Sequence, residues 1–139
     1  MARNSIGKQF SITSFGESHG PMVGSVADGF PGNASIDLDH IRYQMNRRRP
    51  GQSSLSTDRD ETDDFSLVSG VFEGKSTGAP ITFLIPNTNA RSKDYSQIKD
   101  IFRPGHADYT YQAKYKNRDY RGGGRSSARV TAGWVAAGA

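Results

Sequence analysis

Two short turns bounded by glycine place histidines where an imidazole could exchange protons with a ligand. Residues 16–20 read GESHG, which contains Ser18 and His19, and residues 103–108 read RPGHAD, which contains His106. An imidazole titrates near pH ~6.5 and is the ordinary proton donor or acceptor at neutral pH. The two turns are therefore candidates for acid–base chemistry, and ordinary tight turns with solvated histidines are the alternative.

A third stretch has the features of an anion site. Residues 122–129 read GGGRSSAR, so a glycine-rich turn leads into a predicted helix that Ser126 or Ser127 would cap. Backbone N–H groups, two hydroxyls and the positive end of a helix dipole suit a phosphate. Arg125 and Arg129 are four residues apart, which would place them on one helix face. The stretch matches neither G-x-G-x-x-G nor the Walker motif, and a flexible loop before an ordinary cap is the alternative.

Composition fits anion binding and excludes other site chemistries. The 139 residues include 18 Lys plus Arg and 14 Asp plus Glu, a net charge of +4, with no cysteine. Arg outnumbers Lys 12 to 6, which favours recognition of carboxylate and phosphate groups by the planar guanidinium. Zero cysteine excludes disulfides, a cysteine zinc site and a thiol nucleophile. No apolar run approaches the ~20 residues that span a bilayer, so we expect a cytoplasmic protein.

Two segments in which apolar and polar residues alternate flank the GESHG turn and must position it. Residues 10–14 and 22–28 alternate on either side of GESHG and are expected to be extended. Residues 65–72 and 80–85 are rich in β-branched and aromatic side chains and predict an antiparallel pair, joined by the loop 74–78. Together with the helices described below, these strands predict an α+β fold.

The clearest predicted helix covers residues 37–49. Apolar residues recur at helical spacing, acidic residues lie in the first turn, and three arginines precede a Pro-Gly stop. At 100° per residue Arg48 and Arg49 fall near the apolar stripe, whereas Arg47 points away from it. Arg48 or Arg49 should therefore reach any site near the core.

Two further helices are expected in the C-terminal third. One is short and covers residues 109–115, and the other starts at Ser126 or Ser127 and continues to Ala139. The second has no C-terminal cap and no polar tail. We therefore expect the chain to be the N-terminal portion of a longer protein.

Other functions stay open on the residues alone. GESHG also matches the G-x-S-x-G elbow of serine hydrolases, but that elbow leads into a helix, and an alternating segment follows here. Tyrosines between Lys and Arg in residues 109–120 could stack on single-stranded nucleic acid, although the net charge is low and no known motif accompanies them. The acidic run 58–64 lacks the glycine of a calcium loop, so we expect a solvated loop and no metal site.

Four motifs together resemble the chorismate synthase family. In chain order they are GESHG, the helix ending in RRRPG, FRPGHADYTYQAKY and GGGRSSAR, and the likeness runs from about Gly7 to Ala139. The resemblance implies that residues 1–139 are the N-terminal portion of a single domain, part of a layered β-α-β sandwich whose C-terminal part is absent. It also implies a homotetramer when full length, with no nucleic-acid or membrane partner.

The resemblance implies a reaction as well. Members are carbon–oxygen lyases of the shikimate pathway, which leads to the aromatic amino acids. They eliminate phosphate from 5-enolpyruvylshikimate 3-phosphate to give chorismate. They require reduced FMN although there is no net redox change, and NADPH is a candidate reductant. A piece of 139 residues alone is expected to be inactive.

The family's substrate roles transfer to matching positions. His19 would protonate the departing phosphate, and His106 would supply a proton to the anionic reduced flavin. Arg48, Arg103 and Arg129 would hold the phosphate and carboxylates of the substrate.

The flavin roles transfer in the same way. Arg125, Ser126 and Ser127 would contact FMN, and Ser18 would assist near the flavin. Many bacterial members carry another arginine where this chain has Ser54, so one anion contact is expected to be missing or replaced. The aspartate thought to deprotonate the flavin belongs to the absent C-terminal part.

Overall fold

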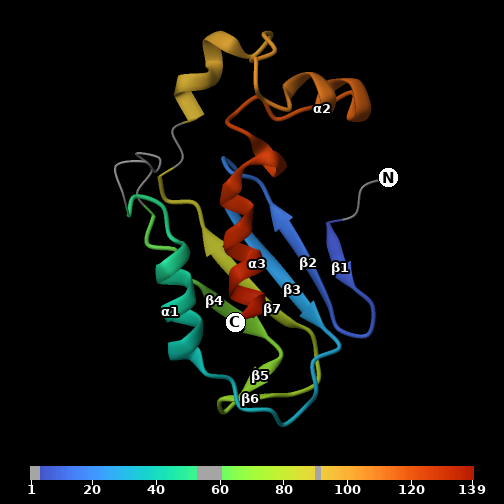
Figure 1. The fold of residues 1–139 in the computed structure, drawn as a ribbon, viewed down its shortest axis with the longest axis vertical. Coiled ribbons are helices and arrows are strands. Elements are labelled where there is room, and N and C mark those ends of the chain that lie inside the picture. Colours follow the sequence, from blue (N-terminus) through green and yellow to red (C-terminus); the bar gives the residue numbers. More distant parts are fainter. Residues whose placement is uncertain (1–3, 53–60, 90–91) are drawn as a thin grey trace.

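A five-stranded antiparallel sheet forms the centre of the protein (Figure 1). The computed structural model describes residues 4–52, 61–89 and 92–139. The sheet order is β1-β2-β3-β7-β4, and a separate two-stranded hairpin pairs β5 with β6. The strands are β1 (Ser5–Gly7), β2 (Ser11–Gly16), β3 (Met22–Asp28), β4 (Ser66–Ser69), β5 (Val71–Phe72), β6 (Lys75–Ser76) and β7 (Ile81–Pro86).

Two helices cover one face of this sheet. They are α1 (Leu38–Arg48) and α3 (Thr131–Gly138), which lie side by side in Figure 1. The 3-10 helix η1 (Ser92–Ile98) and α2 (Asp108–Tyr115) lie beyond one end of the sheet. The arrangement confirms the α+β class. Of the expected sandwich, the described residues supply one strand layer and one helix layer.

Alternation along the strands builds the core between these layers. The register pairs Val23 with Ile85 and Ala27 with Ile81, so their side chains share the helix-covered face. The helices add apolar side chains at helical spacing, which removes apolar surface from water and stabilises the packing. The buried core consists of Val23, Ala27, Ile41, Met45, Ile81, Phe83, Ile85, Ala132 and Ala136.

Small residues let α3 approach β3 closely. A Cβ atom added to Gly133 would lie 2.5 Å from the carbonyl oxygen of Gly24. The helix therefore rests on strand backbone rather than on side chains. This contact fixes the N-terminal end of α3 beside the turn that joins β2 to β3, where the N–H of Ser18 donates to the carbonyl of Gly124 at 3.3 Å.

The strand and helix predictions are largely confirmed. The strands predicted at 10–14 and 22–28 are β2 and β3, and the pair predicted at 65–72 and 80–85 contains the antiparallel pair β4 and β7. The helix predicted at 37–49 is α1, which Asp37 caps by accepting from the N–H of His40 at 2.9 Å. The short helix predicted at 109–115 is α2. Strand β1 was not predicted, the predicted strand 65–72 is divided at Gly70 into β4 and β5, and the predicted loop 74–78 contains β6.

The predicted final helix is confirmed with Ser127 as its cap, but the prediction that Arg125 and Arg129 share one of its faces is wrong. Two 3-10 turns, η2 (Gly124–Ser126) and η3 (Ala128–Val130), precede α3, and between them Ser127 is extended, with φ −75° and ψ 142°. Ser127 caps the helical run that η3 begins and α3 continues, since its Oγ accepts from the N–H of Arg129 at 3.2 Å. Because the extended residue interrupts the helical repeat, Arg125 and Arg129 do not share a face.

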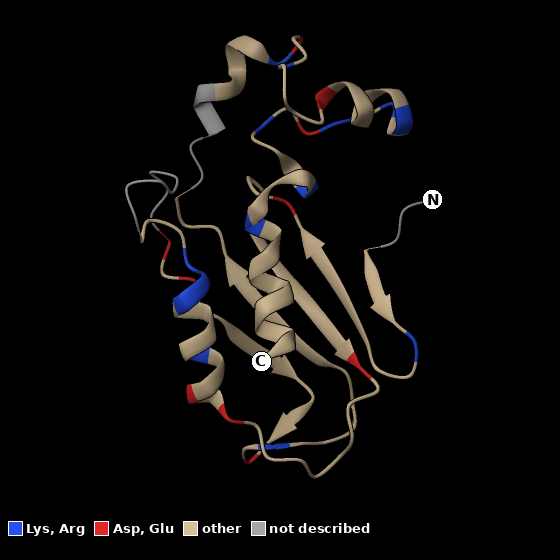
Figure 2. Ribbon diagram, in the orientation of Figure 1, with Lys and Arg blue, Asp and Glu red and all other residues tan. Residues whose placement is uncertain are grey.

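Charged side chains lie outside the layered core. Figure 2 shows that the strands and α3 are almost uncharged, while Lys, Arg, Asp and Glu gather on α1 and in the segment beyond the sheet. Among the helices of the described residues, none has the length and apolar character that crossing a bilayer requires.

Candidate active site

The GESHG turn joins β2 to β3 at one end of the sheet. Ser18 is 1% exposed, and its Oγ lies 3.1 Å from Nδ1 of His19. The side-chain amide of Asn87 donates to the carbonyls of Glu17 at 2.9 Å and Gly20 at 2.8 Å, which fixes the turn from the other side. A strand follows the turn, so the strand–turn–helix context of a hydrolase elbow is absent here, and Ser18 is covered.

His19 is held between the glycine-rich turn and an aromatic ring. Gly122 has φ +60°, and a Cβ atom there would lie 2.1 Å from Nδ1 of His19, so only glycine permits this approach. On another side, the rings of His19 and Tyr95 meet edge to face, with centroids 4.9 Å apart and an interplanar angle of 78°. These contacts fix the orientation of the imidazole.

Arg103 is anchored beside the same ring. Its Nε and Nη2 donate to the two carboxylate oxygens of Asp108, each at 2.8 Å, and Nη2 also donates to the carbonyl of Gly122 at 2.7 Å. Its guanidinium lies over Tyr95, 5.4 Å from the ring centroid. The hydrogen bonds with Arg103 hold the pKa of Asp108 well below its usual range and raise the pKa of Arg103. Both groups are therefore charged at neutral pH.

His106 lies exposed on the rim of a half-open cleft. Its backbone N–H donates to the carbonyl of Arg103 at 3.2 Å, and Nδ1 lies 3.1 Å from the carbonyl oxygen of Pro104. The cleft has a volume of about 410 Å³ and is lined by Tyr95, Arg103, Gly105, His106, Ala107, Gly122, Gly123, Ser126 and Ser127. The RPGHAD turn and the glycine-rich turn thus share one cleft, and His19 contacts two of its lining residues.

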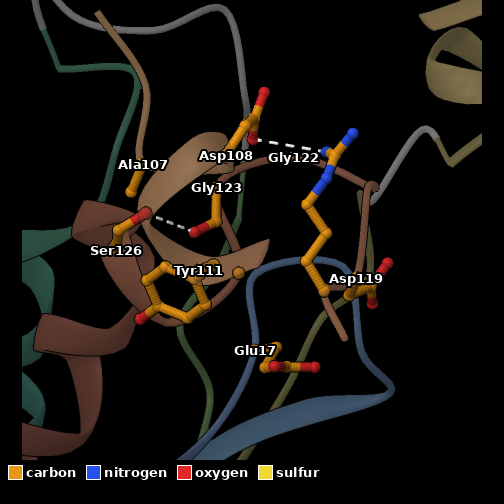
Figure 3. Close-up of a pocket in the computed structure, with 10 residues that line it drawn as sticks. Glu17, Ala107, Asp108, Tyr111, Asp119, Gly122, Gly123 and Ser126 are labelled. Carbon is orange, nitrogen blue, oxygen red and sulfur yellow. Dashed lines mark hydrogen bonds and ion pairs between the residues drawn. The ribbon is translucent and has the colours of Figure 1, made fainter. Parts of the chain in front are cut away.

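A smaller pocket shares part of the glycine-rich turn. Figure 3 shows Gly122, Gly123 and Ser126 among the residues that line it, together with Glu17 and Asp119. Its volume is about 20 Å³, which suits a single water. The hydroxyl of Ser126 donates to the carbonyl of Gly123 at 2.6 Å, so the turn is closed by its own side chain.

A second cationic cluster has a buried carboxylate at its centre. Arg48 of α1 and Arg129 of η3 each donate to one oxygen of Asp63, whose side chain is 0% exposed. Arg129 also donates through Nε to Oδ1 of Asn87 at 2.8 Å and through Nη2 to the carbonyl of Pro86 at 3.0 Å. Arg48 lies on the buried side of its helix, as its phase predicted.

Asn87 connects this cluster to the GESHG turn. Its amide nitrogen donates to Glu17 and Gly20, while its amide oxygen accepts from Arg129. The sequence analysis did not identify Asn87, and only the rule that a buried arginine requires acceptors could have suggested such a partner. It also missed Tyr95 and the structural role of Asp108.

The interpretation of the acidic run as a solvated loop is wrong for Glu61 and Asp63, whereas Asp64 is exposed. Glu61 and Asp63 are 2% and 3% exposed. The carboxylate of Glu61 accepts from the N–H of Thr88 at 3.0 Å, from its hydroxyl at 2.6 Å and from the N–H of Asn89 at 3.2 Å. Both acids are buried because neighbouring segments supply the donors that water would otherwise provide.

Arg125 points away from the cleft that its neighbours line. Its Nη1 donates to the carbonyl of Gly16 at 2.8 Å, and its Nη2 donates to Oγ of Ser14 at 2.5 Å. The structure therefore places Ser126 and Ser127 at the cleft and the Arg125 guanidinium against β2. Ser54 lies outside the described residues.

One imidazole, one guanidinium and two hydroxyls line a cleft at the end of the helix-covered antiparallel sheet of this α+β protein. A family model described as chorismate synthase matches residues 10–139. The chain therefore belongs to the chorismate synthase family, which confirms the resemblance of the four motifs.

Similar proteins agree with this assignment. The chain is 60% identical over 139 residues to a chorismate synthase of Flavobacterium psychrophilum, covering 100% of this chain and 39% of that protein. It is 61% identical over 136 residues to one of Phocaeicola vulgatus, covering 98% of this chain and 38% of that protein. A crystal structure of chorismate synthase matches with a TM-score of 0.62 and 30% identity, covering 90% of this chain and 30% of the other. The chain thus spans well under half the length of these relatives.

Proposed function

We propose that this chain is the N-terminal portion of a single-domain lyase that eliminates phosphate from 5-enolpyruvylshikimate 3-phosphate to give chorismate. The reaction would require reduced FMN without net redox change and would serve aromatic amino acid biosynthesis in the cytoplasm. The observation that carries the proposal is the cleft shared by the RPGHAD and glycine-rich turns, with His19 of the GESHG turn packed against Tyr95 and Gly122 of its lining, in a chain of this family.

The charges of the site suit a substrate with one phosphate and two carboxylates. Arg103 lines the cleft, and with Arg118, which lies 3.5 Å from Asp108, it outnumbers that carboxylate two to one. The pair Arg48 and Arg129 likewise outnumbers Asp63. Each cluster therefore keeps one positive charge in excess, and attraction to an anion strengthens as water is excluded. We assign substrate anions to Arg48 and Arg103, with Arg129 adding charge beside Arg48.

The two histidines suit proton delivery at different places. Phosphate leaves slowly until its charge is neutralised, so an imidazole beside it has a clear task, which we assign to His19. Ser18 supports this role because its hydroxyl contacts Nδ1 and orients the ring. His106 is exposed on the rim, where we assign it the proton supplied to the flavin.

The cleft also has the character of a flavin site. Its volume lies within the ~300–1,000 Å³ of ordinary ligand pockets, and hydroxyls of Ser126 and Ser127 stand on its glycine-lined wall. These two serines would hold FMN, and Arg125 would support them by tying η2 to β2. A bound reduced flavin supplies the electron-transfer chemistry. We further propose NADPH as a reductant and a homotetrameric full-length enzyme.

The test uses the full-length protein under anaerobic conditions. With reduced FMN, we expect 5-enolpyruvylshikimate 3-phosphate to yield chorismate and phosphate in equal amounts, and with oxidised FMN no product. The isolated 139-residue chain is expected to be inactive. Phosphate release that does not depend on reduced flavin would overturn the proposal.

A matched pair of variants tests the role of His106. We expect His106→Ala to lower kcat by about 10²- to 10⁴-fold, as loss of a positioned proton donor does. His40→Ala is the control, because His40 is exposed on α1 and outside the cleft. Normal turnover in His106→Ala would remove His106 from the mechanism.

A further inference from the structure

We propose that Asp63 is a positioning residue for the anion-binding arginines, an inference that rests on the proposed function. Its buried carboxylate holds Arg48 and Arg129 together and fixes the direction in which Arg48 presents its remaining donors to the phosphate or carboxylate of the substrate. Asp63 comes from the segment before β4, so none of the four family motifs includes it.

The two arginines differ in how fully the protein occupies them. Arg129 is held by three acceptors, Asp63, Asn87 and the carbonyl of Pro86, and its side chain is 2% exposed. Arg48 has a side chain 14% exposed and donates to Asp63 alone among the described residues. Arg129 is therefore the fixed member of the pair, and Arg48 is the member with donors available to a ligand.

Electrostatics makes the carboxylate necessary for this arrangement. Two guanidinium groups that approach the same point repel each other, and the repulsion is strong where water is scarce. Asp63 places one oxygen against each group, which offsets the repulsion and still leaves one positive charge in excess. The pair can attract an anion without moving apart.

The backbone at Asp63 allows a clean substitution. Its φ is +55°, in the left-handed region that aspartate and asparagine enter more readily than most residues. Asp63→Asn keeps the shape and the backbone preference, removes the negative charge, and turns an N–H₂ group toward one of the arginines. Asp64→Asn makes the same change at the exposed neighbour and is the matched control.

The experiment measures KM for 5-enolpyruvylshikimate 3-phosphate in the full-length enzyme. Charge alone predicts that Asp63→Asn binds an anion more tightly, because the site becomes more positive. Positioning predicts the opposite, and we expect KM to rise by at least about tenfold, with the inhibition constant of inorganic phosphate changed by less than about threefold. Asp64→Asn should leave KM within about twofold of the wild type.

Each other outcome overturns the proposal. An unchanged KM with fewer folded molecules would make Asp63 purely structural, and a lower KM would make it a competitor of the substrate. If Asp63→Asn does not fold, Asp63→Glu keeps the charge on a longer side chain, and an unchanged KM in that folded variant would also overturn it.

Calorimetry separates this inference from the proposed function. Wild-type enzyme that does not bind 5-enolpyruvylshikimate 3-phosphate would refute the proposed function. If the wild type and Asp63→Asn bind 5-enolpyruvylshikimate 3-phosphate with equal affinity, only the role of Asp63 is refuted.

Discussion

Two carboxylates in this protein are each shared by two arginines, but one links residues of a single segment and the other links elements far apart in the sequence. Asp108 pairs with Arg103 and Arg118, which lie 5 and 10 residues away in one segment beyond the sheet. Asp63 pairs with Arg48 and Arg129, which lie 15 and 66 residues away. The first carboxylate shapes a loop, whereas the second joins α1 to the start of the final helix.

The difference separates local order from tertiary order at the site. Asp108 orients the turn that carries His106, and its contacts can form within residues 103–118. Asp63 requires that the sheet, α1 and η3 have already assembled. Losing the carboxylate of Asp63 should therefore weaken the whole fold, while losing that of Asp108 should mainly affect one wall of the cleft.

The largest effect is expected at the buried carboxylate. Asp63→Ala leaves two arginines without their shared partner, and we expect the free energy of unfolding of the full-length protein to fall by about 3–5 kcal/mol. Denaturant titration measures this value. Asp64→Ala, at the exposed neighbour, should stay within about 0.5 kcal/mol of the wild type. A loss below about 1 kcal/mol in Asp63→Ala would remove the contrast between the two carboxylates.

Packing at the glycine-rich turn is expected to matter next. Gly122→Ala combines a left-handed backbone with a collision against the His19 ring, and we expect a loss of about 2–4 kcal/mol. Gly105→Ala is the control, since its φ is also positive, at +73°, but nothing lies within 4 Å of the added Cβ atom. It should lose only about 1 kcal/mol. Equal losses of stability in the two variants would show that the His19 ring moves aside without an energetic cost.

Measuring the free energy of unfolding as a function of pH isolates the contribution of Asp108. The pKa of Asp108 in the folded protein is lowered from its ordinary value of 3.8 by hydrogen bonds from Arg103, so its stabilisation is present above pH 3.8 and is lost as the pH falls through the folded value. Because asparagine keeps an oxygen that can accept one of these hydrogen bonds, we expect Asp108→Asn to cost about 1–2 kcal/mol at neutral pH. Unfolding free energies of wild type and variant should converge below pH 3.8. A difference that does not change with pH would contradict the assignment.

The smallest effect is expected at a pair that joins no separate segments. Asp119 accepts hydrogen bonds from Arg121, two residues away, which lower the pKa of the Asp119 carboxyl. The Arg121 side chain is 39% exposed, so Asp119→Asn should cost about 0.2–1 kcal/mol and less at high salt. Chemical unfolding with and without about 1 M salt measures this. A loss as large as that of Asp63→Ala would show that burial does not rank these pairs.

Local patterns were sufficient for most elements and for the side that Arg48 takes. The spacing of apolar residues predicts strand 22–28, and the same signal together with a nearby cap predicts helix 37–49. Both elements can therefore be predicted from the sequence alone. The inward direction of Arg48 follows from helical phase. Strand β1 was missed because it has three exposed residues and pairs along only one edge.

The site depended on contacts that no local pattern reports. Asp63 is read as solvent-exposed when only its acidic neighbours are considered, because its partner Arg129 is 66 residues away. The direction of Arg125 depends on the extended backbone of Ser127 and on acceptors in β2. That His19 packs against the cleft shared by the RPGHAD and glycine-rich turns was expected only through the family resemblance.

Asn87 gives the site a property that depends on a single functional group. Carbonyls of the GESHG turn need donors and the Arg129 guanidinium needs an acceptor, so the two ends of one amide meet opposite requirements. An aspartate of the same shape could serve only the guanidinium. Exchanging that nitrogen for oxygen would thus uncouple the histidine turn from the arginine pair at Asp63.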